Sequence, residues 1–115
     1  MKVFKKNNVE ILLFDANRFV LRLRGLIGRE INDFKGLMLT PCNQIHTFFM
    51  NYPIDAVFLS DENIILHIEE NMAPNKIGKK IKNAKKVVEL KSGISKQLGL
   101  GIGNKINIEE TLITG

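Results

Sequence analysis

The sequence predicts a mainly β domain, an α+β fold rich in strands: a small, partly closed antiparallel barrel of about seven short strands with one or two short helices. Short runs of branched and aromatic residues recur along the chain, and Gly, Pro, Asn or Asp separates most of them. At 115 residues, 44% of them hydrophobic and 25% charged, the chain is long enough for one hydrophobic core. We therefore expect residues 1–115 to form a single domain.

The first predicted elements are a strand and a helix. Residues 9–15 (VEILLFD) are rich in branched aliphatic side chains, which is typical of strands. Asn17 is a suitable helix cap, and apolar residues follow it at helical spacing: Phe19, Leu23 and Leu26. We expect residues 18–27 to form a short amphipathic helix that covers one end of the barrel.

Three strands are predicted between residues 35 and 60. Residues 35–40 form the first, which Pro41 ends. Residues 45–50 and 54–60 alternate in apolar character and are separated by the short turn 51–53, so the pattern predicts a tight hairpin.

The second half of the chain repeats this pattern of strands and turns. A turn at 61–63 is expected to lead into another strand, and a polar segment without clear periodicity, residues 71–85, follows it. Ser92-Gly93 opens a possible helical turn that runs to Leu98. The strands predicted in this half are residues 64–70, 86–90 and 105–109.

The segment CNQIHTFFMNYPID, residues 42–55, places reactive groups in an apolar stretch. Cys42 is the only cysteine, so the fold cannot depend on an internal disulfide. His46 follows four residues later, and on a strand the two side chains would lie about 13 Å apart, too far to bind one zinc ion. We predict no metal site and no cofactor. A thiolate–imidazole pair is an alternative, although a lone cysteine is more often an inert buried residue.

Two acids are candidates for a site. Asp55 shares a strand face with Val57 and Leu59, so its carboxylate is expected to be buried and therefore paired. The expected partners are an arginine of residues 18–29 or the N–H groups of the turn 51–53. Glu89 lies on the face of Val87, either at a solvent-facing edge or as a second carboxylate of a pocket.

The net charge of +5 has a local component in the segment KIGKKIKNAKK, residues 76–86. We expect it to form a solvated loop. The alternative is nucleic-acid binding, which would be weak and electrostatic because the segment lacks aromatic residues for base stacking. The first residues lack a hydrophobic run of signal-peptide length, and no apolar run approaches the roughly 20 residues of a membrane span. The sequence is that expected of a soluble, cytoplasmic protein.

Ordered motifs along the chain resemble those of the family known as domain of unknown function 192. They are RGLI at 24–27, FFM at 48–50, PIDAVF at 53–58, VELKSG at 88–93 and GN at 103–104. Ile27 replaces a Met of the family pattern, Val88 a Leu and Asn104 an Asp. The resemblance extends from about Val9 to Ile108. It implies a compact β-rich fold and no reaction, and it marks Met50 and Asp55 as the leading members of any site.

These observations favour a non-catalytic module that binds a small ligand or a peptide. The predicted site is an apolar cleft at the 45–58 hairpin, with Phe48, Met50 and Phe58 as its floor and His46, Asp55 and Arg24 at its rim. A small hydrolase or transferase is the alternative, with Asp55 or Glu89 as general base and His46 as acid or orienting group.

Overall fold

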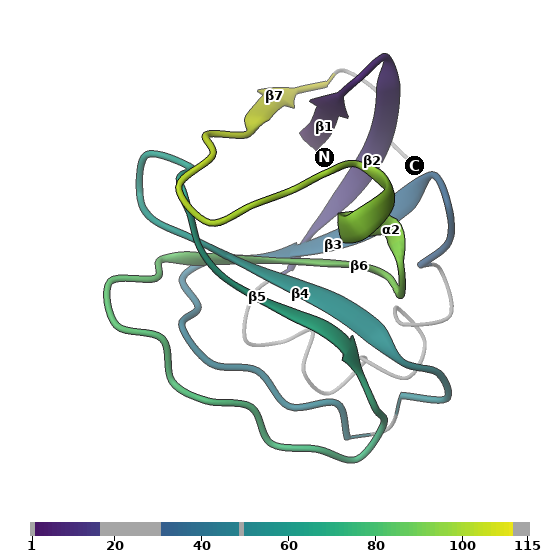
Figure 1. Cartoon of the computed structure of the whole chain (residues 1–115), viewed down its shortest axis with the longest axis vertical. Coiled ribbons are helices and arrows are strands. Elements are labelled where there is room, and N and C mark those ends of the chain that lie inside the picture. The colour runs from purple at the N-terminus through teal and green to yellow at the C-terminus, as the bar shows by residue number, and fades with distance from the viewer. Residues whose placement is uncertain (1, 17–30, 49, 112–115) are drawn as a thin grey trace.

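The computed structural model describes residues 2–16, 31–48 and 50–111, and its main feature is one mixed seven-stranded sheet (Figure 1). The strand order is β5-β4-β6-β3-β2-β1-β7. The strands are β1 (Lys2–Lys6), β2 (Val9–Ala16), β3 (Lys35–Leu39), β4 (Ile54–Leu59), β5 (Ile65–Met72), β6 (Lys86–Lys91) and β7 (Asn107–Glu110), and one short helix, α2 (Ile94–Gln97), follows β6. The prediction of a mainly β domain is confirmed.

The sheet has a hydrophobic cluster on each face. All six residues of β4 are buried, because apolar groups cover both faces of this strand. One face, here called the α2 face, carries Val57 and Leu90 and packs against Ile94 of α2. The other, here called the loop face, carries Phe58 and packs against residues of the segments 40–53 and 73–85, such as Met50.

The sheet is not closed into a barrel, and β5 and β7 are its edges. Among the described residues, the chain before β5 and the chain before β7 meet at an isolated bridge that joins Ile64 to Lys105. The predicted antiparallel arrangement holds for most pairs, but β2 and β3 run parallel, with Leu13 opposite Gly36. A parallel pair requires a long connection, and 18 residues separate the end of β2 at Ala16 from the start of β3 at Lys35.

The predicted hairpin of residues 45–50 and 54–60 is wrong. The described residues of this segment, 45–48 and 50, belong to no strand, and β4 pairs instead with β5 and β6. The segment runs beside the loop that follows β5: the N–H of Thr47 donates to the carbonyl of Lys76 at 2.8 Å. The buried Thr47 hydroxyl donates to the Ala73 carbonyl at 2.6 Å and accepts from the Lys76 N–H at 2.9 Å. These side-chain bonds to backbone replace a regular ladder.

The other predicted elements that fall within the described residues are recovered with small shifts. The turn at residues 61–63 joins β4 to β5, and Asn63 adopts a positive φ of 65° there. The helical turn after Gly93 is α2. β1 was not predicted, and the helix predicted at residues 18–27 lies outside the described residues. In the described part of the chain, no helix is long and apolar enough to cross a membrane.

Candidate functional site

Asp55 is a buried carboxylate that accepts four hydrogen bonds. It lies on β4, on the α2 face, with 1% of its surface exposed. Oδ1 accepts from the N–H of Asn71 at 2.8 Å. Oδ2 accepts from the N–H of Gly93 and of Ser95, both at 3.0 Å, and from the Ser95 hydroxyl at 2.6 Å. The carboxylate therefore fastens the end of β5 and the turn before α2 to β4, the strand next to the edge of the sheet.

The predicted burial of Asp55 on the face of Val57 and Leu59 is confirmed. Backbone N–H groups do hold the carboxylate, but they come from Asn71, Gly93 and Ser95 and not from the predicted turn 51–53. The arginines of residues 18–29, including Arg24, lie outside the described residues. Because both oxygens of Asp55 accept hydrogen bonds, the arrangement is that of a structural anchor.

The segment that Asp55 fastens forms one wall of a pocket. The pocket has a volume of about 290 Å³ and opens at the ends of β3, β4 and β6. Its lining residues come from three turns: Ile31, Asn32 and Asp33; Tyr52 and Pro53; and Lys91 and Ser92. The hydroxyl of Ser92 donates to Oδ1 of Asn71 at 2.7 Å, and the Asn71 N–H in turn donates to Asp55. Asp55 thus positions the wall without lining the pocket.

The walls of this pocket are mainly apolar, with charged groups at the rim. Ile31 is 7% exposed, and Tyr52 and Pro53 are half-buried. The Lys91 amine lies 2.9 Å from Oδ1 of Asp33, and both side chains are more than half exposed, at 52% and 57%. Such an exposed pair is weak, so the Lys91 amine is accessible to a ligand.

Met50 and Phe58, predicted as the floor of a cleft, are packed in the loop-face cluster. They are 4% and 2% exposed. His46 and Phe48 are half-buried neighbours, with ring centroids 4.8 Å apart, and Nδ1 of His46 accepts from the Phe48 N–H at 3.3 Å. The aromatic ring that faces Phe58 is that of His67, at 5.7 Å. The predicted hairpin would place His46 opposite Phe58, whereas in the structure Phe58 lies opposite His67 and Val87.

Glu89 is a second buried carboxylate, and it lies on the loop face. It is fully buried on β6, between β4 and β3, so the edge position considered for it is wrong. Glu89 is opposite Ala56, whereas Asp55 is opposite Leu90. Because successive side chains of a strand point to opposite faces, the two carboxylates diverge across the sheet. Asp55 and Glu89 cannot act together on one substrate.

His67 and Glu69 on β5 were not predicted as candidates. The Nε2 of His67 lies 3.1 Å from Oε2 of Glu69, and the side chains are 30% and 47% exposed. Their spacing of two residues on a strand was the signal that could have found them, since it places both on one face. They lie on the loop face, because Phe58 is opposite His67.

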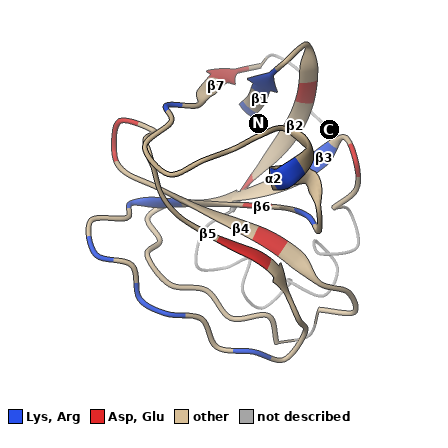
Figure 2. Ribbon diagram, viewed as in Figure 1, with Lys and Arg blue, Asp and Glu red and all other residues tan. Residues whose placement is uncertain are grey.

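The other reactive groups do not assemble into a metal site. Cys42 is half-buried, and its thiol donates to the Gln44 carbonyl at 3.2 Å. Within residues 2–16, 31–48 and 50–111, His, Cys, Asp and Glu form no group of three that could hold a metal ion. The lysine-rich segment forms an exposed loop along one edge of the molecule (Figure 2).

The pocket residues outside the segment 42–55 were not predicted from the sequence. Asn32, Asp33, Lys91 and Ser92 come from two turns far apart in the chain, and each turn alone has ordinary turn composition. Tyr52 and Pro53 are the part of the pocket that the segment 42–55 supplies. The segment 42–55 thus does contribute to the pocket, but through its turn and not through the apolar run that was predicted to line a cleft.

The fold and the ordered motifs define a small domain with an open, mixed β-sheet and short motifs in a fixed order along the chain. The chain belongs to the family domain of unknown function 192, described as an uncharacterized ACR, whose model matches residues 2–108. No curated protein matches the chain significantly.

Two crystal structures have a similar fold. One is of a protein of unknown function from Novosphingobium aromaticivorans DSM 12444, with a TM-score of 0.75 and 17% identity over 92% of this chain and 82% of that one. The other, from Sinorhizobium meliloti 1021, bears the name "putative transcription regulator", with a TM-score of 0.74 and 20% identity over 92% and 90% of the two chains. At these identities the likeness shows the fold alone.

Proposed function

We propose that the domain binds a small, mainly apolar ligand that carries an anionic group, in the pocket between the turns 31–33, 52–53 and 91–92. The observation that carries this proposal is the composition of the pocket: apolar walls with one amine at the rim, that of Lys91, held only by an exposed pair with Asp33. Ligand sites are typically concave, mostly apolar and supplied with few polar groups that orient the ligand.

The size of the pocket favours a small molecule over a peptide. Its volume of about 290 Å³ lies just below the range of about 300–1,000 Å³ found for ligand pockets. Ile31, Tyr52 and Pro53 would contact the apolar body of the ligand. The anionic group would replace Asp33 as the partner of the Lys91 amine, because an exposed ion pair contributes little stability.

The wall that carries Lys91 and Ser92 is held in place before any ligand binds. Ser92 bonds to Asn71, and Asp55 holds the N–H groups of Asn71 and Gly93 on either side. A preformed wall loses little conformational entropy on binding, which favours affinity for a small ligand. Asp55 is therefore explained as a residue that holds the pocket wall, and it needs no catalytic role.

The same geometry disfavours the enzyme alternative built on the predicted acids. General acid–base catalysis by two groups requires them to reach one substrate, within about 2.6–3.2 Å of the transferred proton. Asp55 and Glu89 lie on opposite faces of the sheet. The hydrogen-bonded pair His67–Glu69 is not part of the pocket lining.

A thermal-shift screen of small carboxylic and phosphoric acids with apolar substituents tests the proposal. We expect at least one compound to raise the melting temperature of the parent protein, and we expect Lys91→Met to abolish that rise at an unchanged melting temperature of the free protein. Lys82→Met, an exposed lysine of the 73–85 loop, is the matched control and should bind as the parent does. Equal binding by Lys91→Met, or a screen without any stabilising compound, would contradict the proposal.

A further inference from the structure

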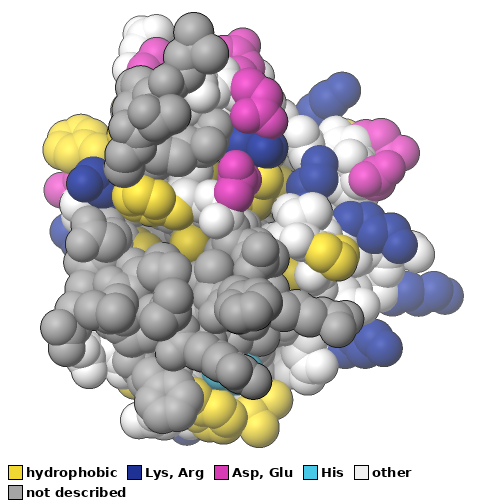
Figure 3. All heavy atoms as spheres, turned by 180° about the vertical axis from the view of Figure 1, so that it is seen from behind, with side chains coloured by type: hydrophobic (Ala, Val, Ile, Leu, Met, Phe, Trp, Pro, Cys, Tyr) yellow, Lys and Arg dark blue, Asp and Glu magenta, His cyan; other side chains and the backbone are white. Residues whose placement is uncertain are grey.

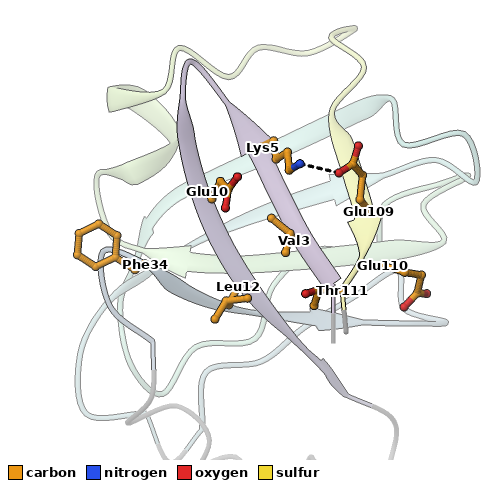
Figure 4. Close-up of a pocket in the computed structure, with 8 residues that line it drawn as sticks. All are labelled: Val3, Lys5, Glu10, Leu12, Phe34, Glu109, Glu110 and Thr111. Atoms are coloured by element: carbon orange, nitrogen blue, oxygen red, sulfur yellow. Dashed lines mark ion pairs between the residues drawn. The ribbon is translucent and has the colours of Figure 1, made fainter. Parts of the chain in front are cut away.

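A groove lies on the outer surface of β1, β2 and β7, apart from the proposed ligand pocket (Figure 4). Phe4, Ile11 and Leu13 point into the α2-face cluster. Alternation along the strands sends Val3 and Leu12 to the other side, where they form an apolar floor. The groove has a volume of about 380 Å³, and Phe34, with 68% of its surface exposed, stands at its edge.

The groove is acidic although the protein is basic. Glu10, Glu109 and Glu110 line it, and Lys5 is the one amine among its lining residues. Lys5 lies 2.7 Å from Glu109, and the nearby Lys2 lies 2.7 Å from Glu110. Glu110 follows Glu109 in β7 and pairs with Lys2, so its carboxylate points to the opposite face from Val3. Glu10 and Glu109 against the one amine of Lys5 leave a local excess of one negative charge, on a chain with a net charge of +5. The Lys5 amine is hydrogen-bonded to Glu109 and is also attracted by the charge of Glu10, and both interactions raise the pKa of Lys5.

The loop after β5 has the opposite character. Its residues 73–85 contain five lysines and no acid, and those lysines are exposed: Lys76, Lys79, Lys80, Lys82 and Lys85. Ile77 stands among them with 69% of its surface exposed. The backbone of the loop is fixed, because the N–H of Gly78 donates to the Ile45 carbonyl at 2.9 Å and that of Ile81 to the Asn43 carbonyl at 2.8 Å.

The two surfaces are complementary in charge and in apolar character. Three large hydrophobic residues are strongly exposed in the described part of the chain, and two of them, Phe34 and Ile77, stand on these surfaces. We propose that the acidic groove binds the lysine loop of a second copy of this chain. Ile77 contacts the apolar floor beside Phe34, and the lysines of the loop face the groove carboxylates.

This contact joins different surfaces of the two copies, so it is heterologous. The groove is at the end of the molecule that carries β1 and β7, and the lysine loop is at the opposite end (Figure 2). The view from behind also shows acidic side chains gathered at the upper end and lysines projecting along the lower right edge (Figure 3). A head-to-tail contact leaves a free groove and a free loop at the two ends, so assembly continues beyond a dimer unless it closes into a ring.

Sedimentation of the full chain over a concentration series tests the proposal. At about 0.01 M salt, where the Debye length is about 30 Å, the average mass should rise with protein concentration beyond that of a dimer. At about 1 M salt, where it is about 3 Å, the protein should be monomeric. Mass that stays monomeric at low salt, or association that is insensitive to salt, would overturn the proposal.

Two charge-reversal variants assign the surfaces. Glu10→Lys changes the groove and leaves the loop intact, and the double variant Lys79→Glu with Lys80→Glu changes the loop and leaves the groove intact. Each variant alone should remain monomeric at low salt. Mixed in equal amounts they should form one-to-one dimers and nothing larger, because only one groove and one loop of each pair remain complementary. A mixture that stays monomeric, or either variant associating alone as the parent does, would overturn the proposal.

Two controls distinguish the proposed contact from non-specific association and from bridging by nucleic acid. Lys96→Glu reverses an exposed lysine on α2, outside both surfaces, and should associate as the parent does. All variants should retain the parental circular dichroism spectrum and unfold cooperatively. If treatment of the parent with nuclease abolishes its association, nucleic acid bridges the lysine loops and the proposed protein contact is wrong.

Discussion

Replacing Asp55 by alanine should strongly destabilise the fold. Apart from Glu89, no other described carboxylate should cost as much stability when it is removed. The side chain is 1% exposed, and it accepts hydrogen bonds from three backbone N–H groups and one hydroxyl. Alanine leaves all four donors without their acceptor. The effect is on the free energy of unfolding, because the four hydrogen bonds join Asp55 to two other segments of the chain, one at Asn71 and one at residues 93–95.

The magnitude follows from the burial of the donors. Two of the four belong to Ser95, which is 1% exposed, and an unsatisfied buried donor costs about 1–3 kcal/mol. Asn71 and Gly93 are exposed residues, so water can accept hydrogen bonds from their N–H groups, and their part of the lost stability is smaller. We expect a loss of about 3–5 kcal/mol, from a total that for domains of this kind is on the order of 5–15 kcal/mol.

Urea unfolding at equilibrium measures this loss, provided that the slope m is unchanged. Ser95→Ala removes one donor and leaves the carboxylate with three others, so it should cost less than Asp55→Ala. Asp61→Ala is the matched control, because Asp61 is exposed in the turn between β4 and β5, and it should stay within about 0.5 kcal/mol of the parent. An Asp55→Ala protein as stable as the Asp61→Ala control would refute the anchoring role.

Three further predictions concern other parts of the sheet. Gly36→Ala should lower the urea midpoint, at a cost of about 1–3 kcal/mol, because its Cβ would lie 2.7 Å from the backbone oxygen of Glu89; a parental midpoint would contradict the tight β3–β6 contact. Thr47→Val should cost about 1–3 kcal/mol by leaving two backbone groups of the 73–85 loop unpaired, and unchanged stability would argue against that contact. Hydrogen bonding to the Lys5 amine lowers the pKa of Glu109, so the stability from this pair is present above the ordinary glutamate pKa and is lost as the pH falls through the lower folded value. In an NMR titration, Lys5→Met should raise the Glu109 pKa toward its ordinary value, and an unchanged midpoint would exclude the pair in solution.

The strands that were predicted correctly are those whose own residues decide their structure. β4 is a run buried on both faces, and β2 has the apolar run Ile11 to Phe14 at its middle. β1 was missed because three of its five residues are lysines, and its burial comes from Val3 and Phe4 alone. The segment 45–50 alternates in apolar character like a strand, but Thr47 bonds to the irregular loop that follows β5, at Ala73 and Lys76. Local pattern cannot reveal that choice of partner.

Of the site, the sequence could predict only what the immediate sequence neighbours of one residue determine. The apolar neighbours of Asp55 were enough to predict burial and the need for donors. The donors themselves are 16, 38 and 40 residues away in the sequence, so the fold had to be known to name them. The parallel pairing of β2 with β3 is non-local in the same way, and the turn at 31–33 that follows from it lines the pocket.

Asp55 and Lys91 make separable contributions to the proposed binding function. Asp55 acts on the pocket through the backbone of residues 71 and 93 and through Ser92, so its removal would weaken binding and stability together. Lys91 is exposed at the rim, so its replacement would weaken binding while leaving stability unchanged. A loss of function on mutating Asp55 would therefore not identify it as a catalytic group. Only a variant that loses function at parental stability, as Lys91→Met is expected to do, locates the ligand.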